Sequence, residues 1–399
     1  MAATMDWAAT RRRFHLPDGV IYLDGNSLGP LPVAAAERVR RTVQDEWGEM
    51  LIRGWNEAGW MDWPARLGDR IGRLIGAAPG SVVVGDTLSI KVYQALASAL
   101  EMRPDRRVIL SDSGNFPTDL YMAEGLIASL GRGHELRVVA PGDVAEAIDA
   151  DVAVLMLTTV DYRTGRMHDM AALSEAARAA GAVTIWDLAH SAGAHEVDLA
   201  GVGADFAVGC TYKYFNAGPG APAFIYVRPD LQEEVRPALA GWLGHEAPFA
   251  FDPSYRPGRG IERMRVGTPP VLQLAALEAA LDVWDDVDMA ALRARSLELS
   301  ERFAAGVAAR CPELVPALPP EVARGSQVSF RHPEGYAIMQ ALIADGVIGD
   351  FRAPDILRFG FTPLYLSEAD VDAALDRLER IVTGATWDRP EFRARKAVT

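Results

Sequence analysis

The stretch AVTIWDLAHSAG, residues 182–193, decides the fold class of this chain. A run of apolar and β-branched residues leads into Asp187, and small residues follow it. Such an unbroken apolar run is typical of a strand that is buried on both faces of a parallel sheet. Because an unpaired carboxylate is costly at the end of a buried strand, we expect Asp187 to have a partner.

Similar strand-like runs alternate with helix-like runs on both sides of this stretch. The strand-like segments span 81–87, 107–111, 135–140, 151–158, 182–187, 204–210 and 222–227. Helical periodicity occupies 88–100, about 118–130, and 170–181, where Gly181 ends the helix. The alternation predicts an α/β fold, in which a mostly parallel sheet of the seven-stranded type is covered by helices. Ligands of such sheets bind at the carboxyl ends of the strands.

The pattern of predicted strands and helices changes at about residue 271. Long helical patterns rich in alanine and leucine continue to residue 310, strand patterns follow at 326–332 and 355–361, and a last helix covers about 368–384. This order predicts a smaller α+β domain. We therefore predict that residues 1–45 join the small domain, that 46–285 form the large domain, and that 286–399 form the small C-terminal domain.

Composition excludes several classes of protein. The chain has 399 residues, of which 49% are hydrophobic and 24% charged, with a formal net charge of -14. That charge repels phosphate backbones and anionic membranes, so neither nucleic acid nor membrane is an expected partner. Its two cysteines are too few for a disulfide framework, and its seven scattered histidines form no metal-binding motif. No apolar run approaches ~20 residues and no secretory signal is recognisable, which predicts a cytoplasmic protein.

A second stretch, CTYKYFNAGPGAP at residues 210–222, places Lys213 at the end of a later strand. Taken alone, Lys213 reads as a surface lysine and Asp187 as a helix cap or the partner of an arginine. Together they suggest more, because an acid for the pyridine nitrogen and an amine for the aldehyde are the two anchors of pyridoxal phosphate.

A phosphate cradle is available in GDTLSIKVYQ, residues 85–94. Gly85 permits a tight turn, and a helix N-terminus with free N–H groups follows it. A plain N-cap at Thr87 or Ser89 is the alternative interpretation. The chain has no Walker A sequence, no complete dinucleotide-binding fingerprint, no HExxH and no Gly-x-Ser-x-Gly elbow.

These motifs resemble those of the kynureninase family, within the fold-type I pyridoxal phosphate enzymes related to class V aminotransferases. The matching segments are YLDGNSLGPLP (22–32), GDTLSI (85–90), NFPTDLY (115–121), DYRTGRMHD (161–169), DLAHSAG (187–193), TYKYFNAGPG (211–220), GWLGH (241–245) and RMRVGTPPVLQLAALEAAL (263–281). They occur in family order and extend over most of residues 20–362.

The resemblance implies a set of cofactor contacts. Lys213 is expected to hold pyridoxal phosphate covalently, Asp187 to pair with the pyridine nitrogen, and Phe116 to stack on its ring. His190 and Asp119 are expected beside the cofactor. The remaining expected cofactor-binding residues are Leu88, Ser89, Thr158 and Tyr212, and Trp242 and Thr268 contributed across a homodimer interface.

The resemblance also implies a substrate site. Arg358 is expected to bind the substrate carboxylate, with Trp55, Gly267 and Thr268 lining the pocket. Alternatives remain from the residues themselves: Trp55, Phe116 and Trp242 could be core aromatics, and Arg358 could balance Asp355 on the surface. Arg263 and Arg265 are expected to be structural.

The reaction that the resemblance implies is hydrolytic cleavage of the Cβ–Cγ bond of L-kynurenine, giving anthranilate and L-alanine, in tryptophan catabolism. Asp187, Tyr212 and Lys213 are the expected catalytic residues, and 3-hydroxykynurenine is the expected poorer substrate. An aminotransferase, a cysteine desulfurase using Cys210 or Cys311, and a binding protein that uses no cofactor remain alternatives.

Overall fold

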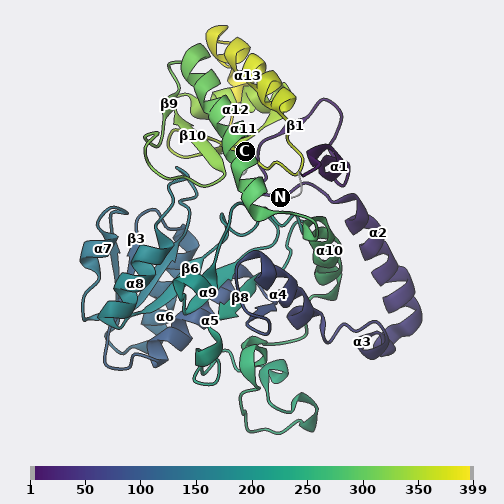
Figure 1. Cartoon of the computed structure of the whole chain (residues 1–399), viewed down its shortest axis with the longest axis vertical. Helices are drawn as coiled ribbons and strands as arrows, with labels where there is room; N and C mark the ends of the chain where they lie inside the picture. The colour runs from purple at the N-terminus through teal and green to yellow at the C-terminus, as the bar shows by residue number, and fades with distance from the viewer. Residues whose placement is uncertain (1–4, 396–399) are drawn as a thin grey trace.

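The computed structural model describes residues 5–395, and two sheets organise it (Figure 1). The larger sheet has seven strands in the order β2-β8-β7-β6-β5-β3-β4. Neighbouring strands from β4 through β7 are parallel, whereas β8 is antiparallel to both β7 and β2. The predicted α/β class and mostly parallel sheet are confirmed. The strands are β2 (Val82–Val84), β3 (Val108–Asp112), β4 (Glu135–Val139), β5 (Val152–Thr158), β6 (Val183–Asp187), β7 (Phe206–Gly209) and β8 (Phe224–Val227).

Both faces of this sheet are covered because successive side chains of a strand point to opposite sides. In β5, Leu155 and Leu157 join the cluster that contains α4 and α8, whereas Val154 and Met156 join the cluster that contains α5 and α6. The helices around the sheet are α4 (Trp63–Leu74), α5 (Leu88–Glu101), α6 (Pro117–Leu130), α7 (Val144–Ala147), α8 (Met170–Ala180) and α9 (Leu199–Val202). As predicted, Gly181 ends α8 in the left-handed conformation, with φ 77°.

A second sheet is antiparallel and has the order β12-β13-β10-β9. Figure 1 shows it with its helices at the top of the molecule, above the large sheet. Its strands are β9 (Val315–Pro316), β10 (Gln327–Arg331), β12 (Asp350–Arg352) and β13 (Ile356–Gly360). The helices of this part are α11 (Met289–Arg310), α12 (Gly335–Ala344), α13 (Glu368–Thr383) and α14 (Pro390–Arg393). This agrees with the predicted smaller α+β element.

The N-terminal segment contacts both parts of the chain. It holds α1 (Trp7–Arg11) and β1 (Ile21–Tyr22), which pairs in parallel with β11 (Val347–Ile348) next to the small sheet. An arm then follows, made of α2 (Val33–Arg41), the π-helical η1 (Thr42–Met50), η2 (Leu51–Arg53) and α3 (Gly54–Glu57). In this arm α2 contacts α10 (Val271–Leu281). The exact domain boundaries stay a prediction, and their outermost residues, 1–4 and 396–399, lie outside the described residues.

Short 3-10 helices complete the chain between β8 and α11. They are η3 (Pro229–Leu231), η4 (Trp242–Gly244), η5 (Pro248–Ala250), η6 (Gly260–Met264) and η7 (Asp282–Trp284). The segment 240–258 projects below the large sheet in Figure 1. Within residues 5–395, no helix combines the length and the apolar character that a membrane crossing requires.

Candidate functional site

Two buried carboxyl groups lie at the carboxyl edge of the large sheet. Register pairs Thr158 at the end of β5 with Asp187 at the end of β6, and Asp187 in turn with Val208 of β7. Asp119, in the first turn of α6, reaches the same place, and both carboxyl groups are 2% exposed. The backbone N–H of Ala189 donates to Oδ1 of Asp187 over 2.8 Å, which fixes its orientation.

Burial changes how this acidic pair holds protons. Desolvation raises the pKa of Asp187, and desolvation followed by the charge of Asp187 raises the pKa of Asp119 well above its usual range. Asp119 therefore keeps its proton more readily, and it can donate a hydrogen bond to Asp187. The pair then carries one negative charge in a dry place, where it complements a buried cation.

Lys213 follows β7 and faces this pair. Its Nζ lies 3.0 Å from Nε2 of His190 and 5.8 Å from the ring centres of Phe116 and Tyr212. Burial, with the charges of Lys213 and Arg358, lowers the pKa of His190 well below its usual range, so the imidazole is neutral. A neutral imidazole can accept a hydrogen bond from the Lys213 ammonium group, and Gln327 contacts the same imidazole.

Lys213 is the lysine that chemistry at this edge can use. The sequence contains three lysines, Lys91, Lys213 and Lys396. Lys91 is 1% exposed, and its Nζ is held by Asp86 at 3.1 Å, Gln94 at 2.9 Å and the carbonyl of Met264 at 3.1 Å. Lys396 lies outside the described residues.

An aromatic wall stands beside Lys213. Phe116 precedes α6 and is 40% exposed, so part of its ring is accessible to a ligand. Its ring meets that of Tyr162 in a T-shaped contact, with a centroid distance of 5.1 Å and an interplanar angle of 81°. Phe116 is thus only partly a core aromatic, and an accessible aromatic ring suits stacking.

The start of α5 offers an anion site. Leu88 and Ser89 are its first residues, and Thr87 before them makes no side-chain capping bond. The N–H of Lys91 is the first that bonds to a carbonyl, that of Thr87, which leaves the three preceding N–H groups for a ligand. The plain N-cap that the sequence allowed is therefore not formed.

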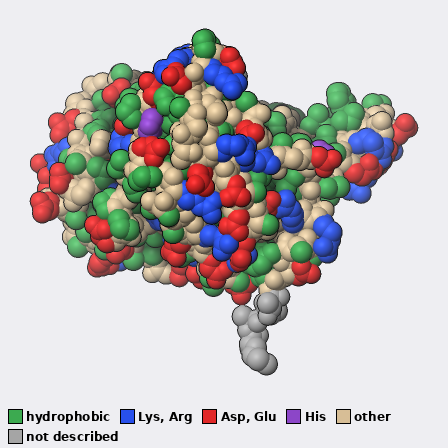
Figure 2. Space-filling model, turned by 90° about the horizontal axis from the view of Figure 1, so that it is seen from above, with side chains coloured by type: hydrophobic (Ala, Val, Ile, Leu, Met, Phe, Trp, Pro, Cys, Tyr) green, Lys and Arg blue, Asp and Glu red, His purple; other side chains and the backbone are tan. Residues whose placement is uncertain are grey.

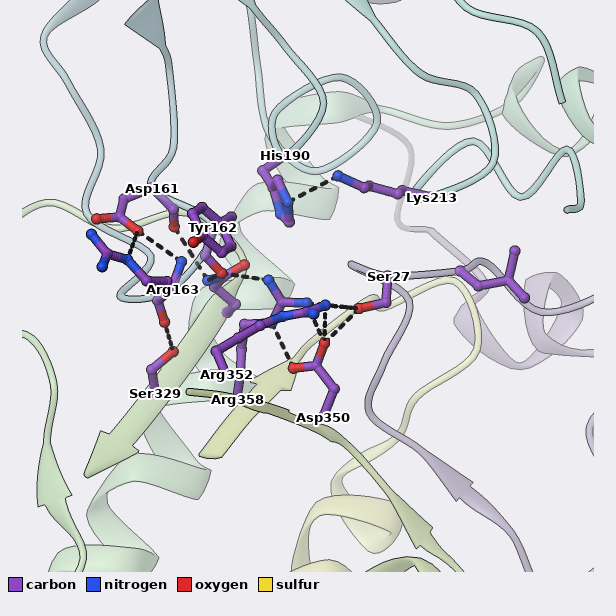
Figure 3. A network of polar contacts seen from close by, with 12 residues as sticks. Ser27, Asp161, Tyr162, Arg163, His190, Lys213, Ser329, Asp350, Arg352 and Arg358 are labelled. Atoms are coloured by element: carbon purple, nitrogen blue, oxygen red, sulfur yellow. Dashed lines mark hydrogen bonds and ion pairs between the residues drawn. The ribbon is translucent and has the colours of Figure 1, made fainter. Parts of the chain in front are cut away.

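An arginine network lies opposite Lys213, on the small sheet (Figure 3). The register of β12 and β13 pairs Asp350 with Arg358, and each side chain is 1% exposed. Nε of Arg358 donates to Oδ1 of Asp350 over 2.8 Å, and its terminal nitrogens donate to Oδ2 of Asp350, the hydroxyl of Ser27 and the carbonyl of Tyr162.

The alternative of a surface pair between Arg358 and Asp355 is wrong, because Asp355 pairs with Arg331. The sequence did not predict that Ser27, Tyr162, Asp350 or Arg352 would join this network. Asp350, Arg352 and Arg358 do lie close together in GDFRAPDILRFG, residues 349–360. The pairing that joins them depends on the antiparallel turn between β12 and β13.

Four other predicted site residues lie outside the strands of the large sheet. Trp55 is half-buried, and its ring meets that of Trp60 edge-on with the centroids 5.5 Å apart. Trp242 is 42% exposed and contacts Phe249 at 5.7 Å, on the segment that projects below the sheet. Gly267 and Thr268 are exposed as well. The roles of these four residues stay predictions. Thr158, in contrast, lies at the edge of the large sheet beside Asp187, and its hydroxyl donates to the carbonyl of Val160.

Structural comparison agrees with this fold. The apo structure of a cysteine desulfurase from Thermococcus onnurineus NA1 has a TM-score of 0.80 at 19% identity, covering 96% of this chain and 100% of that chain. A variant of C-DES with glycine covalently linked to the PLP cofactor has a TM-score of 0.81 at 20% identity, covering 94% of this chain and 99% of that one. At these identities the likeness concerns the fold.

Sequence comparison is more specific. The family model described as "Kynureninase C-terminal domain" matches residues 292–378. A kynureninase from Burkholderia pseudomallei (strain 1106a) is 52% identical over 400 residues, which cover 98% of this chain and 96% of that protein. A kynureninase from Pseudomonas fluorescens matches with the same identity and coverage. The chain belongs to the kynureninase family.

Proposed function

We propose that this protein is a kynureninase that hydrolyses L-kynurenine to anthranilate and L-alanine, in tryptophan catabolism. Water adds its oxygen to the γ-carbonyl carbon, the Cβ–Cγ bond breaks, and Cβ gains a proton to become the methyl group of alanine. The observation that carries the proposal is the placement of Lys213, next to neutral His190 and the buried acidic pair, opposite Arg358. The 52% identity to curated kynureninases supports it.

The residues at the sheet edge fit pyridoxal phosphate. Asp187, coupled to Asp119, supplies a buried negative charge for a protonated pyridine nitrogen, and the partly exposed ring of Phe116 suits stacking on the pyridine ring. The open N–H groups at Leu88 and Ser89 suit its phosphate. Tyr212 and Thr158 complete the proposed cofactor site. When bound, the cofactor supplies an electron sink for negative charge that develops on the substrate carbons.

The side chains then perform the proton transfers. Lys213 removes the proton from Cα of the substrate, and His190 accepts a hydrogen bond that orients its amine. Burial, with the neighbouring Cys210, raises the pKa of Tyr212, so its phenol keeps its proton at neutral pH. We propose that this phenol protonates Cβ after cleavage. Asp187 would hold its negative charge at the pyridine nitrogen and so preserve the electron sink.

Arg358 is the proposed anchor of the substrate carboxylate, since it lies on the small sheet opposite Lys213 (Figure 3). A Cβ added at Gly267 would meet no atom within 4 Å in this chain, so the space beside it is open. We propose that Gly267, Thr268 and Trp55 line the substrate pocket, with Thr268 contributed across the dimer interface. Within that dimer we expect kynurenine to be preferred over its 3-hydroxy derivative.

A homodimer with shared active sites is part of the proposal. The arm at the right of Figures 1 and 2 exposes Trp47, Leu51 and Ile52 at 57%, 63% and 77%, and Figure 2 shows hydrophobic side chains gathered on it. Phe249 and Phe251 on the projecting segment are 64% and 78% exposed. Two such apolar surfaces support burial in a dimer that brings Trp242 and Thr268 to the partner's site. Sedimentation velocity tests this, and a monomer at micromolar concentration would contradict it.

The positions of the two cysteines disfavour a cysteine desulfurase. Cys210 and Cys311 are both buried free thiols, and burial raises the pKa of each. A desulfurase needs a reactive, accessible thiolate, and neither residue provides one. The cytoplasmic location remains part of the proposal and is tested by fractionating the source cells.

The proposed function is tested with the purified protein and pyridoxal phosphate. We expect a yellow absorbance band, and fluorescent anthranilate when L-kynurenine is added. Absence of the band would contradict the cofactor assignment. A band without anthranilate would leave the fold in place but overturn the reaction.

A further inference from the structure

Arg358 alone has little capacity left for a substrate carboxylate. A guanidinium group has five N–H donors, and a two-point grip on a carboxylate uses two of them. Nε of Arg358 is taken by Asp350, one terminal nitrogen by Asp350 and Ser27, and the other by the carbonyl of Tyr162. One N–H therefore remains, so Arg358 in this arrangement gives a single contact.

Arg352 lies beside Arg358 and has donors to spare. Its Nη2 donates to Oδ2 of Asp350 over 2.6 Å and to the hydroxyl of Ser27 over 3.3 Å. Its Nε is enclosed by protein and has no hydrogen-bond partner. The side chain is 37% exposed, unlike the fully buried Arg358, so the open side of the guanidinium is accessible to a ligand.

The charges of this network leave an excess of positive charge. Two guanidinium groups share the single carboxylate of Asp350, whose pKa they lower against the opposing effect of burial. Asp24 is the second nearby carboxyl, and burial followed by the charge of Asp350 raises its pKa to about 7. Near neutral pH, Asp24 therefore offsets only part of the second positive charge, and the network favours an added anion.

The open side of the network faces the proposed cofactor site. Both Arg352 and Arg358 lower the pKa of His190 through their charges, and Arg352 also acts on Tyr212. Figure 3 shows the two guanidinium groups side by side, with His190 and Lys213 across from them. An anion seated there would place the rest of an amino acid toward Lys213.

We propose that Arg352 is a second carboxylate-binding residue, and that the α-carboxylate of the substrate is held jointly by Arg352 and Arg358. This inference rests on the proposed function, which it deepens. Asp350 and Ser27 hold the two guanidinium groups at a common position. The pair makes the site select α-amino acids over amines that lack the carboxylate.

The test compares ligands with and without the carboxylate in the Arg352→Gln variant. Kynurenine and L-alanine carry the group, and kynuramine, the decarboxylated amine, lacks it. Binding is read from the change that each ligand causes in the cofactor absorbance, and kinetics from anthranilate release. Loss of a charge-assisted contact should weaken binding of kynurenine and L-alanine roughly 10- to 100-fold and leave kynuramine unchanged. The effect should fall on KM more than on kcat.

Arg331→Gln is the matched control, because Arg331 lies on β10 of the same sheet, on the other side of β13 from Arg352, and pairs with Asp355 at the surface. It should leave all three affinities unchanged. Arg352→Lys keeps the charge but loses the fork, so it should restore part of the affinity. If Arg352→Gln does not bind cofactor, the same titrations are carried out with Arg352→Lys. Two results with this variant overturn the inference: full wild-type affinity for L-alanine, or equal losses of affinity for L-alanine and kynuramine. Since the alanine titration does not need turnover, it can fail or succeed independently of kynurenine cleavage.

Discussion

The two sides of the proposed site, at the edge of the large sheet and on the small sheet, differ in how their buried charges are paired. At the edge of the large sheet, Asp119, Asp187 and His190 are buried among one another and Lys213, with protonation shifted by desolvation. On the small sheet, Arg358 and Asp350 are equally buried, but they form an ion pair with each other, and Arg358 also donates to a backbone carbonyl. The edge of the large sheet can therefore bind a cation and transfer protons. The arginine network on the small sheet can bind an anion at a fixed position.

This difference has a physical cause. A buried group without a strong partner shifts its pKa and becomes useful for proton transfer, whereas a buried ion pair keeps its charges at the cost of desolvation. Substitutions on the first side should therefore change chemistry more than stability. Substitutions on the second side should change stability and ligand affinity together.

The largest effect is expected for Lys213→Ala. Because Lys213 is both the covalent anchor and the base at Cα, kynurenine turnover should fall by at least about 10⁴-fold. Borohydride reduction of the wild-type protein, followed by peptide mass spectrometry, should find the cofactor on Lys213. The control Lys91→Met should keep the absorbance band, since Lys91 is enclosed by Asp86, Gln94 and Met264. Cofactor attached to Lys91 would contradict the assignment.

Asp350→Ala should have the next largest effect, on stability. It leaves Arg358 buried without its counter-charge, which should lower the free energy of unfolding by about 3–5 kcal/mol. Urea denaturation of the apoprotein measures the change. Asp355→Ala, which breaks the surface pair with Arg331, should cost about 0–1 kcal/mol. Equal losses in the two variants would remove the contrast between a buried and a surface pair.

A smaller effect separates the two members of the acidic pair. Since Asp119 is expected to be protonated, Asp119→Asn resembles the native state and should change kcat by less than about 10-fold. Asp187→Asn removes the charge that faces the pyridine nitrogen and should lower kcat by about 100-fold. Steady-state anthranilate release measures both. The reverse order would mean that Asp119 carries the charge.

The smallest effect concerns pH and Asp24. The folded-state pKa of Asp24 is raised to about 7, so its proton stabilises the fold at low pH and that contribution is lost as pH rises from about 4 to 7. Asp24→Asn cannot ionise, so its stability relative to wild type should improve by about 1–2 kcal/mol between pH 6 and pH 8. Thermal unfolding at the two pH values measures this. Asp18→Asn, at an exposed site, is the control, and a pH-independent difference for Asp24→Asn would refute the assignment.

Much of the large domain could be predicted from the sequence. Most strands of the large sheet are apolar runs, and the sequence located all seven; six of them run in one direction, with only β8 reversed, so their carboxyl ends lie on one edge. Asp187 and Lys213 were recognisable because each is a charge at the end of such a run. The family resemblance then supplied Phe116, Asp119, His190 and Arg358, which no local pattern identifies.

The arginine network could not be predicted in the same way. Ser27 lies more than 300 residues from Asp350 in the chain, and β1 pairing with β11 brings the two segments together. Tyr162 contributes a backbone carbonyl, which has no sequence signature. Whether Arg352 faces solvent or the site depends on the packing of β12 against β13, and the pattern of residues does not determine it.

The most direct test of the central claim is the reaction itself, run with L-kynurenine in ¹⁸O-labelled water. We expect equimolar anthranilate and L-alanine, with one ¹⁸O atom in the anthranilate carboxylate, because water attacks the γ-carbonyl carbon. Mass spectrometry of both products reads this out. A keto acid formed from kynurenine, with the cofactor left aminated and no anthranilate, would contradict the account and indicate an aminotransferase.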